Sequence, residues 1–145
     1  MTFRHVKSFN FLAISNTRVS STLLKNSFRA SQQAEIVNAG IQPVQNFAVL
    51  KKIISLGGDK MGHGKETIEK GFDALEKLVC EFGGKYSVGD ELSIADLCLV
   101  PQVYNARRFK VDEKKYPRIY QISARLESLP AFIEAHPDNQ VDAVF

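Results

Sequence analysis

The chain has 145 residues, of which 44% are hydrophobic and 24% are charged, and its formal net charge is +3 at pH 7. This composition is typical of a globular domain, and so small a positive charge does not indicate nucleic-acid binding. No apolar run reaches the roughly 18 residues that a membrane-spanning helix needs. We therefore expect neither a nucleic-acid nor a membrane partner.

The first 27 residues are basic, rich in serine and free of acidic side chains, and the first acidic residue of the chain is Glu35. This composition is typical of a mitochondrial transit peptide, and a disordered leader is the alternative. We interpret residues 1–27 as a leader and residues 28–145 as the folded domain.

Two helices are predicted after the leader. The stretch SFRASQQAEIVNAG would begin with Ser27 as its N-terminal cap and end at Gly40. The next stretch, GIQPVQNFAVLKKIISLGG, places Pro43 in a first helical turn, where proline is favoured. Its apolar residues fall on one helical face: Val44, Phe47, Leu50 and Ile54.

Residues 57–64 read GGDKMGHG, a glycine-rich stretch between two helical patterns. A phosphate-binding loop is one interpretation, but such a loop ends in Gly-Lys-Ser/Thr and follows a strand, and this stretch meets neither condition. A flexible connector is therefore the expected structure.

The stretch KETIEKGFDALEKLVCEFGG, residues 65–84, has the pattern of an amphipathic helix. Apolar residues recur at spacings of three and four, with charged residues on the opposite face. The apolar set is Ile68, Phe72, Leu75, Val79 and Phe82, and the charged set is Glu66, Lys70, Asp73 and Lys77.

Residues 92–109, LSIADLCLVPQVYNARRF, contain the signals of a firmly specified helix start. Ser93 and Asp96 have the spacing of a capping box, and Leu92 with Leu97 that of a hydrophobic staple. Pro101 should bend this helix, because it removes a backbone donor and crowds the preceding turn. The apolar residues Ile94, Leu97, Cys98 and Val100 predict a central, buried helix.

Two further helices are predicted, one between Pro117 and Pro130 and a short one before Pro137, and no alternating strand pattern is found. The predicted fold class is therefore all-α. Cys80 and Cys98 lie in apolar helical patterns, so we expect buried, reduced thiols. The cysteine and histidine spacing resembles no zinc site, and no metal is expected.

Three stretches resemble a known family: GIQPVQN (residues 40–46), GDELSIADLCLVPQVYNARRFKVD (89–112) and YPRIYQISARLESLPAFIEAHPDNQVDA (116–143). Together they resemble the C-terminal helical domain of the zeta-class glutathione transferases, the maleylacetoacetate isomerases. The resemblance covers about residues 28–143 and implies a helical bundle of that type.

The resemblance also implies a function, the glutathione-dependent cis–trans isomerisation of maleylacetoacetate in tyrosine and phenylalanine breakdown. It implies that Gln42, Asn46, Phe47 and Ala48 line glutathione, although the family usually has serine where this chain has Ala48. Arg108 matches the arginine expected to hold a substrate carboxylate, a task that suits a guanidinium fork. Arg107 replaces the family's usual glutamate, so we expect a more cationic corner there.

The family's thiol-activating motif, Ser-Ser-Cys after a first strand, is not found in this sequence, and Ser20-Ser21-Thr22 matches it only superficially. We therefore expect the thioredoxin-like domain to be missing, no catalytic residue in the chain, and weak or no activity. The alternatives are a non-catalytic helical interaction module, or a chain that gains glutathione chemistry by pairing with another subunit.

The resemblance further suggests a small-molecule substrate and a possible homodimer. The expected location is the cytoplasm, or the mitochondrion if the basic leader acts as a transit peptide.

Overall fold

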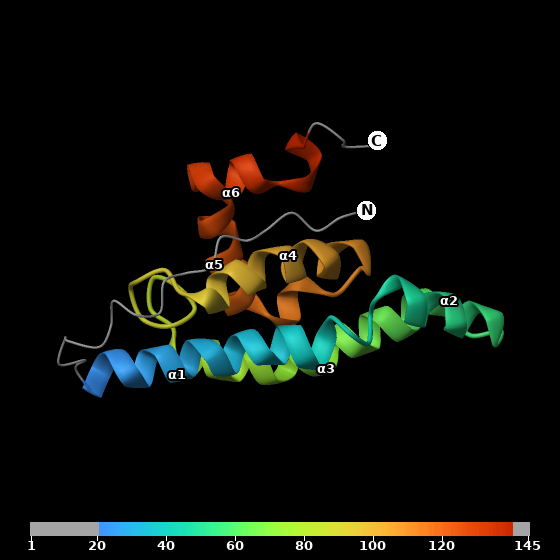
Figure 1. The fold of residues 1–145 in the computed structure, drawn as a ribbon, viewed down its shortest axis with the longest axis horizontal. Helices are drawn as coiled ribbons and strands as arrows, with labels where there is room; N and C mark the ends of the chain where they lie inside the picture. Colours follow the sequence, from blue (N-terminus) through green and yellow to red (C-terminus); the bar gives the residue numbers. More distant parts are fainter. Residues whose placement is uncertain (1–20, 141–145) are drawn as a thin grey trace, which may run out of the picture.

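The computed structural model describes residues 21–140, which are mostly helical (Figure 1). Within this range there is no β-strand, only an isolated bridge between Gly83 and Gly89. The elements in chain order are α1 (Ser21–Glu35), η2 (Ile36–Ile41), α2 (Phe47–Ser55), α3 (Lys60–Phe82), α4 (Ile94–Arg108), η3 (Glu113–Lys115), α5 (Pro117–Glu127), α6 (Pro130–Ala135) and η4 (Pro137–Asn139). The prediction of an all-α fold is confirmed.

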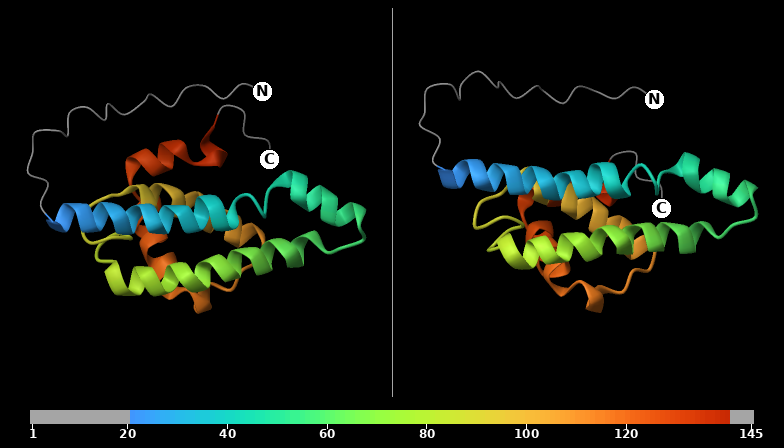
Figure 2. Two further views of the ribbon diagram at one scale, coloured as in Figure 1. Left: turned by 60° about the horizontal axis from the view of Figure 1, so that its bottom comes forward. Right: turned by 90° about the horizontal axis from the view of Figure 1, so that it is seen from below.

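Helices α1 and α3 run side by side in opposite directions, and α4 packs against both α1 and α5 (Figures 1 and 2). The buried face of α3 is the predicted stripe, with Ile68, Phe72, Leu75 and Val79 each at most 2% exposed. The fifth member, Phe82, is only half-buried. The apolar spacing of the α3 sequence therefore predicted correctly which face of the helix is buried, because a helix packs against the core with its continuous apolar face.

The first helix differs from its predicted bounds. It begins at Ser21, before the expected cap at Ser27, and it passes directly into the six-residue π-helix η2, which contains Gly40. A π-helix turn spaces backbone hydrogen bonds five residues apart. Accordingly, the Gln42 N–H donates to the Val37 carbonyl oxygen at 2.9 Å, which fixes the start of the following turn.

The second predicted helix is shorter than expected. Pro43 lies in the turn before α2, not in a helical first turn, and Asn46 caps α2 through its side chain, which accepts from the Val49 N–H. None of the α2 residues is buried, and Phe47 is 71% exposed. The apolar face of α2 therefore exists, but the described part of the chain does not cover it.

The glycine-rich stretch is not a flexible connector. Helix α3 already begins at Lys60, capped by Asp59, and includes Gly62 and Gly64. Gly64 is buried, and a side-chain carbon at this position would collide with the ring of Phe109. Glycine is needed here because α3 and the end of α4 approach each other closely.

The start of α4 has the predicted capping box. The Asp96 carboxylate accepts from the Ser93 N–H at 2.9 Å and also from the buried Ser87 N–H at 2.9 Å, so it ties the preceding loop to the helix. The expectation that Leu97 is buried is wrong, since it is 58% exposed, and its staple partner Leu92 is 47% exposed. Ile94 is also exposed, so only part of the expected apolar surface faces the core.

Helix α4 continues through Pro101 as one α-helix. Its buried residues are Ala95, Asp96, Leu99, Gln102, Val103 and Ala106. The thiols are both free, but Cys80 is exposed and Cys98 only half-buried, so the expectation of two buried thiols is wrong.

Candidate functional site

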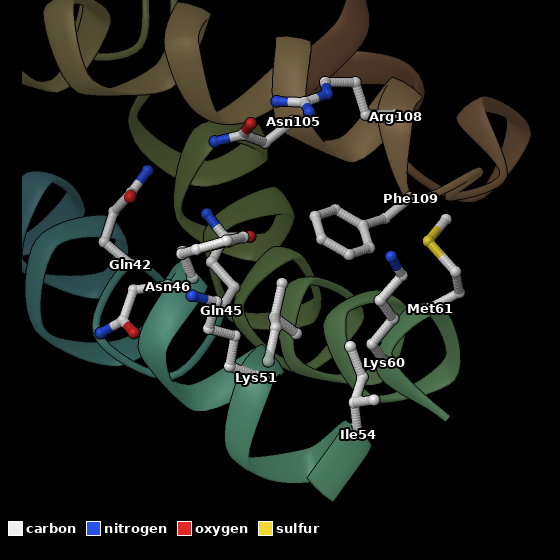
Figure 3. A pocket seen from close by; sticks show the side chains of 12 residues that line it. Gln42, Gln45, Asn46, Lys51, Ile54, Lys60, Met61, Asn105, Arg108 and Phe109 are labelled. Atoms are coloured by element: carbon white, nitrogen blue, oxygen red, sulfur yellow. The ribbon is translucent and has the colours of Figure 1, made fainter. Parts of the chain in front are cut away.

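A cavity of about 430 Å³ opens between the turn before α2, the helix α2, the start of α3 and the end of α4 (Figure 3). Its lining includes Gln42, Asn46, Phe47 and Arg108, which are four of the five residues that the sequence assigned to ligand binding. The fifth, Ala48, is exposed and does not line the cavity. The fold thus brings together residues that are up to 66 positions apart in the sequence (42 to 108).

The lining of this cavity is cationic. Lys51, Lys60 and Arg108 contribute positive charge, and no aspartate or glutamate is among the lining residues. Figure 3 shows Arg108 and Asn105 projecting from α4 on one side, with Gln42 and Gln45 on the other. Such a surface attracts anions, and guanidinium and amide groups suit carboxylates.

Arg108 is positioned by the way α4 ends. The Val111 N–H donates to the Ala106 carbonyl oxygen and the Lys110 N–H to that of Arg107, each at 3.0 Å, which is the pattern of a Schellman motif. Lys110 adopts the left-handed conformation that this motif requires, with φ of 56°. Within residues 21–140 the exposed Arg108 side chain has no hydrogen-bond or ion-pair partner, so its guanidinium is available to a ligand.

Arg107 behaves differently from its neighbour. Its guanidinium lies 2.9 Å from the Glu127 carboxylate and 3.6 Å from that of Glu113, and also approaches the ring of Tyr120. The two carboxylates offset its charge. The excess positive charge expected from Arg107 is therefore partly balanced within the fold by Glu127 and Glu113.

Gln42 belongs to a network of three side-chain amides. Its Nε2 donates to Gln102 Oε1 at 3.0 Å, and Gln45 Nε2 donates to the same oxygen at 2.9 Å. Gln102 Nε2 returns a bond to Gln45 Oε1 at 3.3 Å. The network holds Gln42 at the cavity wall. The side-chain oxygen of Gln42, Oε1, has no hydrogen-bond partner among the described residues.

The side chain of Asn46 has a structural role. Its Oδ1 accepts from the Val49 N–H at 3.0 Å, and its Nδ2 donates to the Pro43 carbonyl oxygen at 2.7 Å. These bonds cap α2 and leave at most one donor for a ligand. Phe47 contributes an exposed ring to the cavity, stacked under the Lys51 ammonium at 4.6 Å from the ring centroid.

Among the further lining residues that the sequence did not assign to the site are Lys51, Lys60 and Asn105. Lys51 lies in a predicted helix, Lys60 in the expected connector, and Asn105 in the helix that was predicted to be central and buried. The position of Asn105, three residues before Arg108 on one helix, was the one available signal. Asn105 and Arg108 also line a second cavity of about 560 Å³ between α4 and the segment of α6 and η4.

Residues 21–140 contain neither a cluster of metal-binding side chains nor a membrane-spanning helix. In this part of the chain no three His, Cys, Asp or Glu side chains are clustered to hold a metal ion. No helix described here has the length and apolar character to span a membrane.

Comparison with known proteins connects this geometry to a family. Residues 58–135 match the family model described as "Glutathione S-transferase, C-terminal domain". The chain is 53% identical over 109 residues to "Probable maleylacetoacetate isomerase 2" of Drosophila melanogaster. The matched region covers 74% of this chain and 47% of that relative. It is 47% identical over 117 residues to the maleylacetoacetate isomerase of Dictyostelium discoideum, covering 79% and 53%.

Solved structures agree with these relatives. A crystal structure of maleylacetoacetate isomerase from Anaeromyxobacter dehalogenans, described with bound dicarboxyethyl glutathione and citrate in its active site, superposes with a TM-score of 0.77 at 40% identity. The match covers 81% of this chain and 54% of that one. A maleyl pyruvate isomerase described as a zeta-class glutathione S-transferase matches with the same TM-score at 37% identity, covering 81% and 58%.

A family model that covers more than half of the chain, together with this superposition, defines the class: the chain belongs to the glutathione S-transferase family, through its C-terminal domain. Within that family its similarity is to the zeta class, the group of the maleylacetoacetate isomerases. The chain spans about half the length of the curated relatives that it matches.

Proposed function

We propose that residues 28–145 form the helical half of a zeta-class, maleylacetoacetate isomerase-type active site, preceded by residues 1–27 as a leader whose end continues into α1. The supporting observation is the acid-free cavity that combines Arg108, Lys51 and Lys60 with the amides of Gln42 and Asn105. Residues 21–27 are part of α1, and the leader's first 20 residues lie outside the described range.

Glutathione fits the chemistry of this cavity. It is an anionic peptide with two carboxylates and several N–H groups, and the cavity offers cations together with an unpaired amide oxygen. Gln42 would accept from an N–H of the peptide, while Asn46 and Phe47 would line it. Ala48 lies outside the cavity wall, so its contact would depend on a ligand that extends along α2.

Arg108 would hold one carboxylate of the dicarboxylic substrate through two parallel, charge-assisted hydrogen bonds. Glutathione, when bound, supplies the thiol for cis–trans isomerisation. Among the described residues that line the cavity none carries a hydroxyl or thiol group, so this half binds and orients, and activation of the thiol requires groups beyond this surface.

The test is to add glutathione to the 145-residue chain and to monitor its binding by nuclear magnetic resonance. Glutathione should shift the amide signals of Gln42, Phe47, Asn105 and Arg108 with a Kd on the order of 1 mM, because half a site provides only about −4 kcal/mol. No acceleration of maleylacetoacetate isomerisation over glutathione alone is expected. Shifts spread evenly over α3 and α5, or a glutathione-dependent rate that Arg108→Ala removes, would contradict the proposal.

A protein-interaction module is the second candidate, favoured by three exposed apolar residues at the start of α4: Leu92, Ile94 and Leu97. Loss of a partner through Ile94→Asp, with no effect of Arg108→Ala, would support it. The reverse pattern would support the ligand site.

Two finer expectations belong to the same proposal. A second copy of the chain would form a homodimer, which equilibrium sedimentation can detect. The protein would act in the cytoplasm, and a mitochondrial signal from residues 1–27 fused to a fluorescent protein would contradict this location.

A further inference from the structure

We infer that Gln102, a buried residue that does not line the cavity, is a positioning residue that sets the polarity of Gln42 and thereby selects ligands carrying an N–H donor. This inference deepens the proposed function and rests on it for the identity of the ligand. It depends on the amide network, on burial and on the donor and acceptor capacity of each side chain.

The network is well protected from water. Gln102 is 0% exposed and Gln45 is 6% exposed, whereas Gln42 is only half-buried and reaches the cavity. Buried amide groups are nearly always hydrogen-bonded, since an unpaired one loses its hydration without compensation. The arrangement of these three side chains is therefore strongly constrained.

The donor and acceptor capacity of each amide determines which groups of Gln42 remain for a ligand. Gln102 Oε1 accepts from both Gln42 and Gln45, which uses both of its lone pairs. Gln42 must then direct its NH₂ group inward to Gln102. Its side-chain oxygen Oε1, which has no partner in the described part of the chain, is then left for a ligand, together with the second N–H of its NH₂ group.

An amide oxygen accepts hydrogen bonds and donates none. The Oε1 atom of Gln42 therefore favours a peptide N–H or an ammonium group, both of which glutathione has. A simple dicarboxylate such as maleate carries no N–H donor and gains nothing from this oxygen. The same cavity thus has two chemically different ends, an acceptor at Gln42 and a cation at Arg108.

Helix α4 contributes to both ends of the cavity. Gln102 and Arg108 lie on α4, and Gln102 meets residues 42 and 45 at the junction of η2 and the following turn. The π-helix turn places Gln42 there through its N–H bond to Val37.

The experiment compares Gln102→Leu with Gln33→Leu as a matched control. Gln33 is also a buried glutamine, 1% exposed, but it bonds to the Ser87 carbonyl oxygen away from the cavity. Binding of glutathione and of maleate to the 145-residue chain is titrated for both variants. Gln102→Leu should weaken glutathione binding about three- to tenfold and maleate binding less than twofold.

A double-mutant cycle with Gln42→Leu separates positioning from general destabilisation. If Gln102 acts through Gln42, adding Gln102→Leu to Gln42→Leu should change glutathione affinity less than twofold. Additive losses, an equal loss of maleate binding, or an equal effect of Gln33→Leu would overturn the inference.

A measurement without ligand distinguishes this inference from the proposed function. The side-chain NH₂ signal of Gln42 should be protected from solvent exchange in the wild type and lose that protection in Gln102→Leu. An unprotected NH₂ in the wild type would overturn the positioning role. If the NH₂ behaves as expected but glutathione does not bind, then the positioning stands, and the proposed ligand and the selectivity inferred from it are wrong.

Discussion

Arg107 donates to Glu127 across 2.9 Å, while the adjacent Arg108 has no ion-pair partner in residues 21–140. Successive residues on an α-helix point about 100° apart, so two neighbouring arginines face different surroundings. Arg107 contacts Glu127 of α5 and Glu113 of η3. Both arginines line the second cavity, but only Arg108 also lines the first. The same residue type thus forms an ion pair at one position and, at the next, is free for the ligand contact that we propose.

Exchanging each arginine for alanine should separate these roles. Arg108→Ala should reduce the affinity for maleate about tenfold, since a charge-assisted bond to a carboxylate is lost, and leave stability within about 0.5 kcal/mol. Arg107→Ala should cost about 0.5–1 kcal/mol of unfolding free energy, because its bridge is partly exposed, and change affinity less than twofold. Titration calorimetry and urea unfolding provide the two measurements, and equal effects of both variants on affinity would contradict the division.

The cap of α2 should decide whether that helix is ordered. Helix α2 buries no residue, so Asn46→Ala should remove about 1 kcal/mol of local stability and increase amide hydrogen exchange within residues 47–55 only. Asn46→Asp keeps an acceptor for the Val49 N–H and is the matched control. Equal exchange in both variants would mean that something other than the cap holds α2.

Gly64 should tolerate no side chain. Alanine there would meet the Phe109 ring and push it toward the cavity, with an expected loss of about 1–3 kcal/mol in unfolding free energy. Gly40 is the control: no atom lies within 4 Å of an added side-chain carbon, so Gly40→Ala should be neutral or stabilising by up to about 1 kcal/mol. A Gly64→Ala variant as stable as the wild type would contradict the close approach.

Two buried tyrosines should respond differently to loss of the hydroxyl group. The Tyr116 hydroxyl lies 3.0 Å from the Asp73 carboxylate, whereas the Tyr120 hydroxyl is buried without a partner in the described residues. Tyr116→Phe should cost about 1 kcal/mol, and Tyr120→Phe should be neutral or stabilising. Thermal unfolding at pH 7 tests the pair.

The same tyrosines predict a loss of stability in alkali. Burial raises the pKa of Tyr120 to about 12, with Glu113 adding to the shift and Arg107 opposing it. Burial, followed by the hydrogen bond to Asp73, also raises the pKa of Tyr116. Because the unfolded chain ionises first, near pH 10, stability should be complete below that pH and fall as the pH rises toward 12.

Tyr120→Phe should reduce the steepness of this alkaline loss without removing it, since Tyr116 still contributes. Urea unfolding at intervals between pH 9 and 12 measures the slope. An unchanged slope in Tyr120→Phe would show that burial does not disfavour its ionised form.

The regular features of the fold were accessible from the sequence because they depend on neighbours along the chain. The stripe of α3 repeats within one helix, and the capping box joins Ser93 to Asp96 within one turn. The resemblance to the zeta class also required only the order of residues, and it pointed to Gln42 and Arg108. These inferences needed no knowledge of which helices touch.

The tertiary structure decided everything that depends on residues far apart in the chain. It showed that Lys51 and Lys60 share a cavity with Arg108, and that Glu127 offsets the charge of Arg107. It also showed that Gln102, an unremarked glutamine, contacts Gln42 60 positions away. Hydrophobic periodicity tells which face of a helix is apolar, but only packing determines whether that face is covered, and so α2 and the start of α4 carry apolar side chains on exposed surfaces.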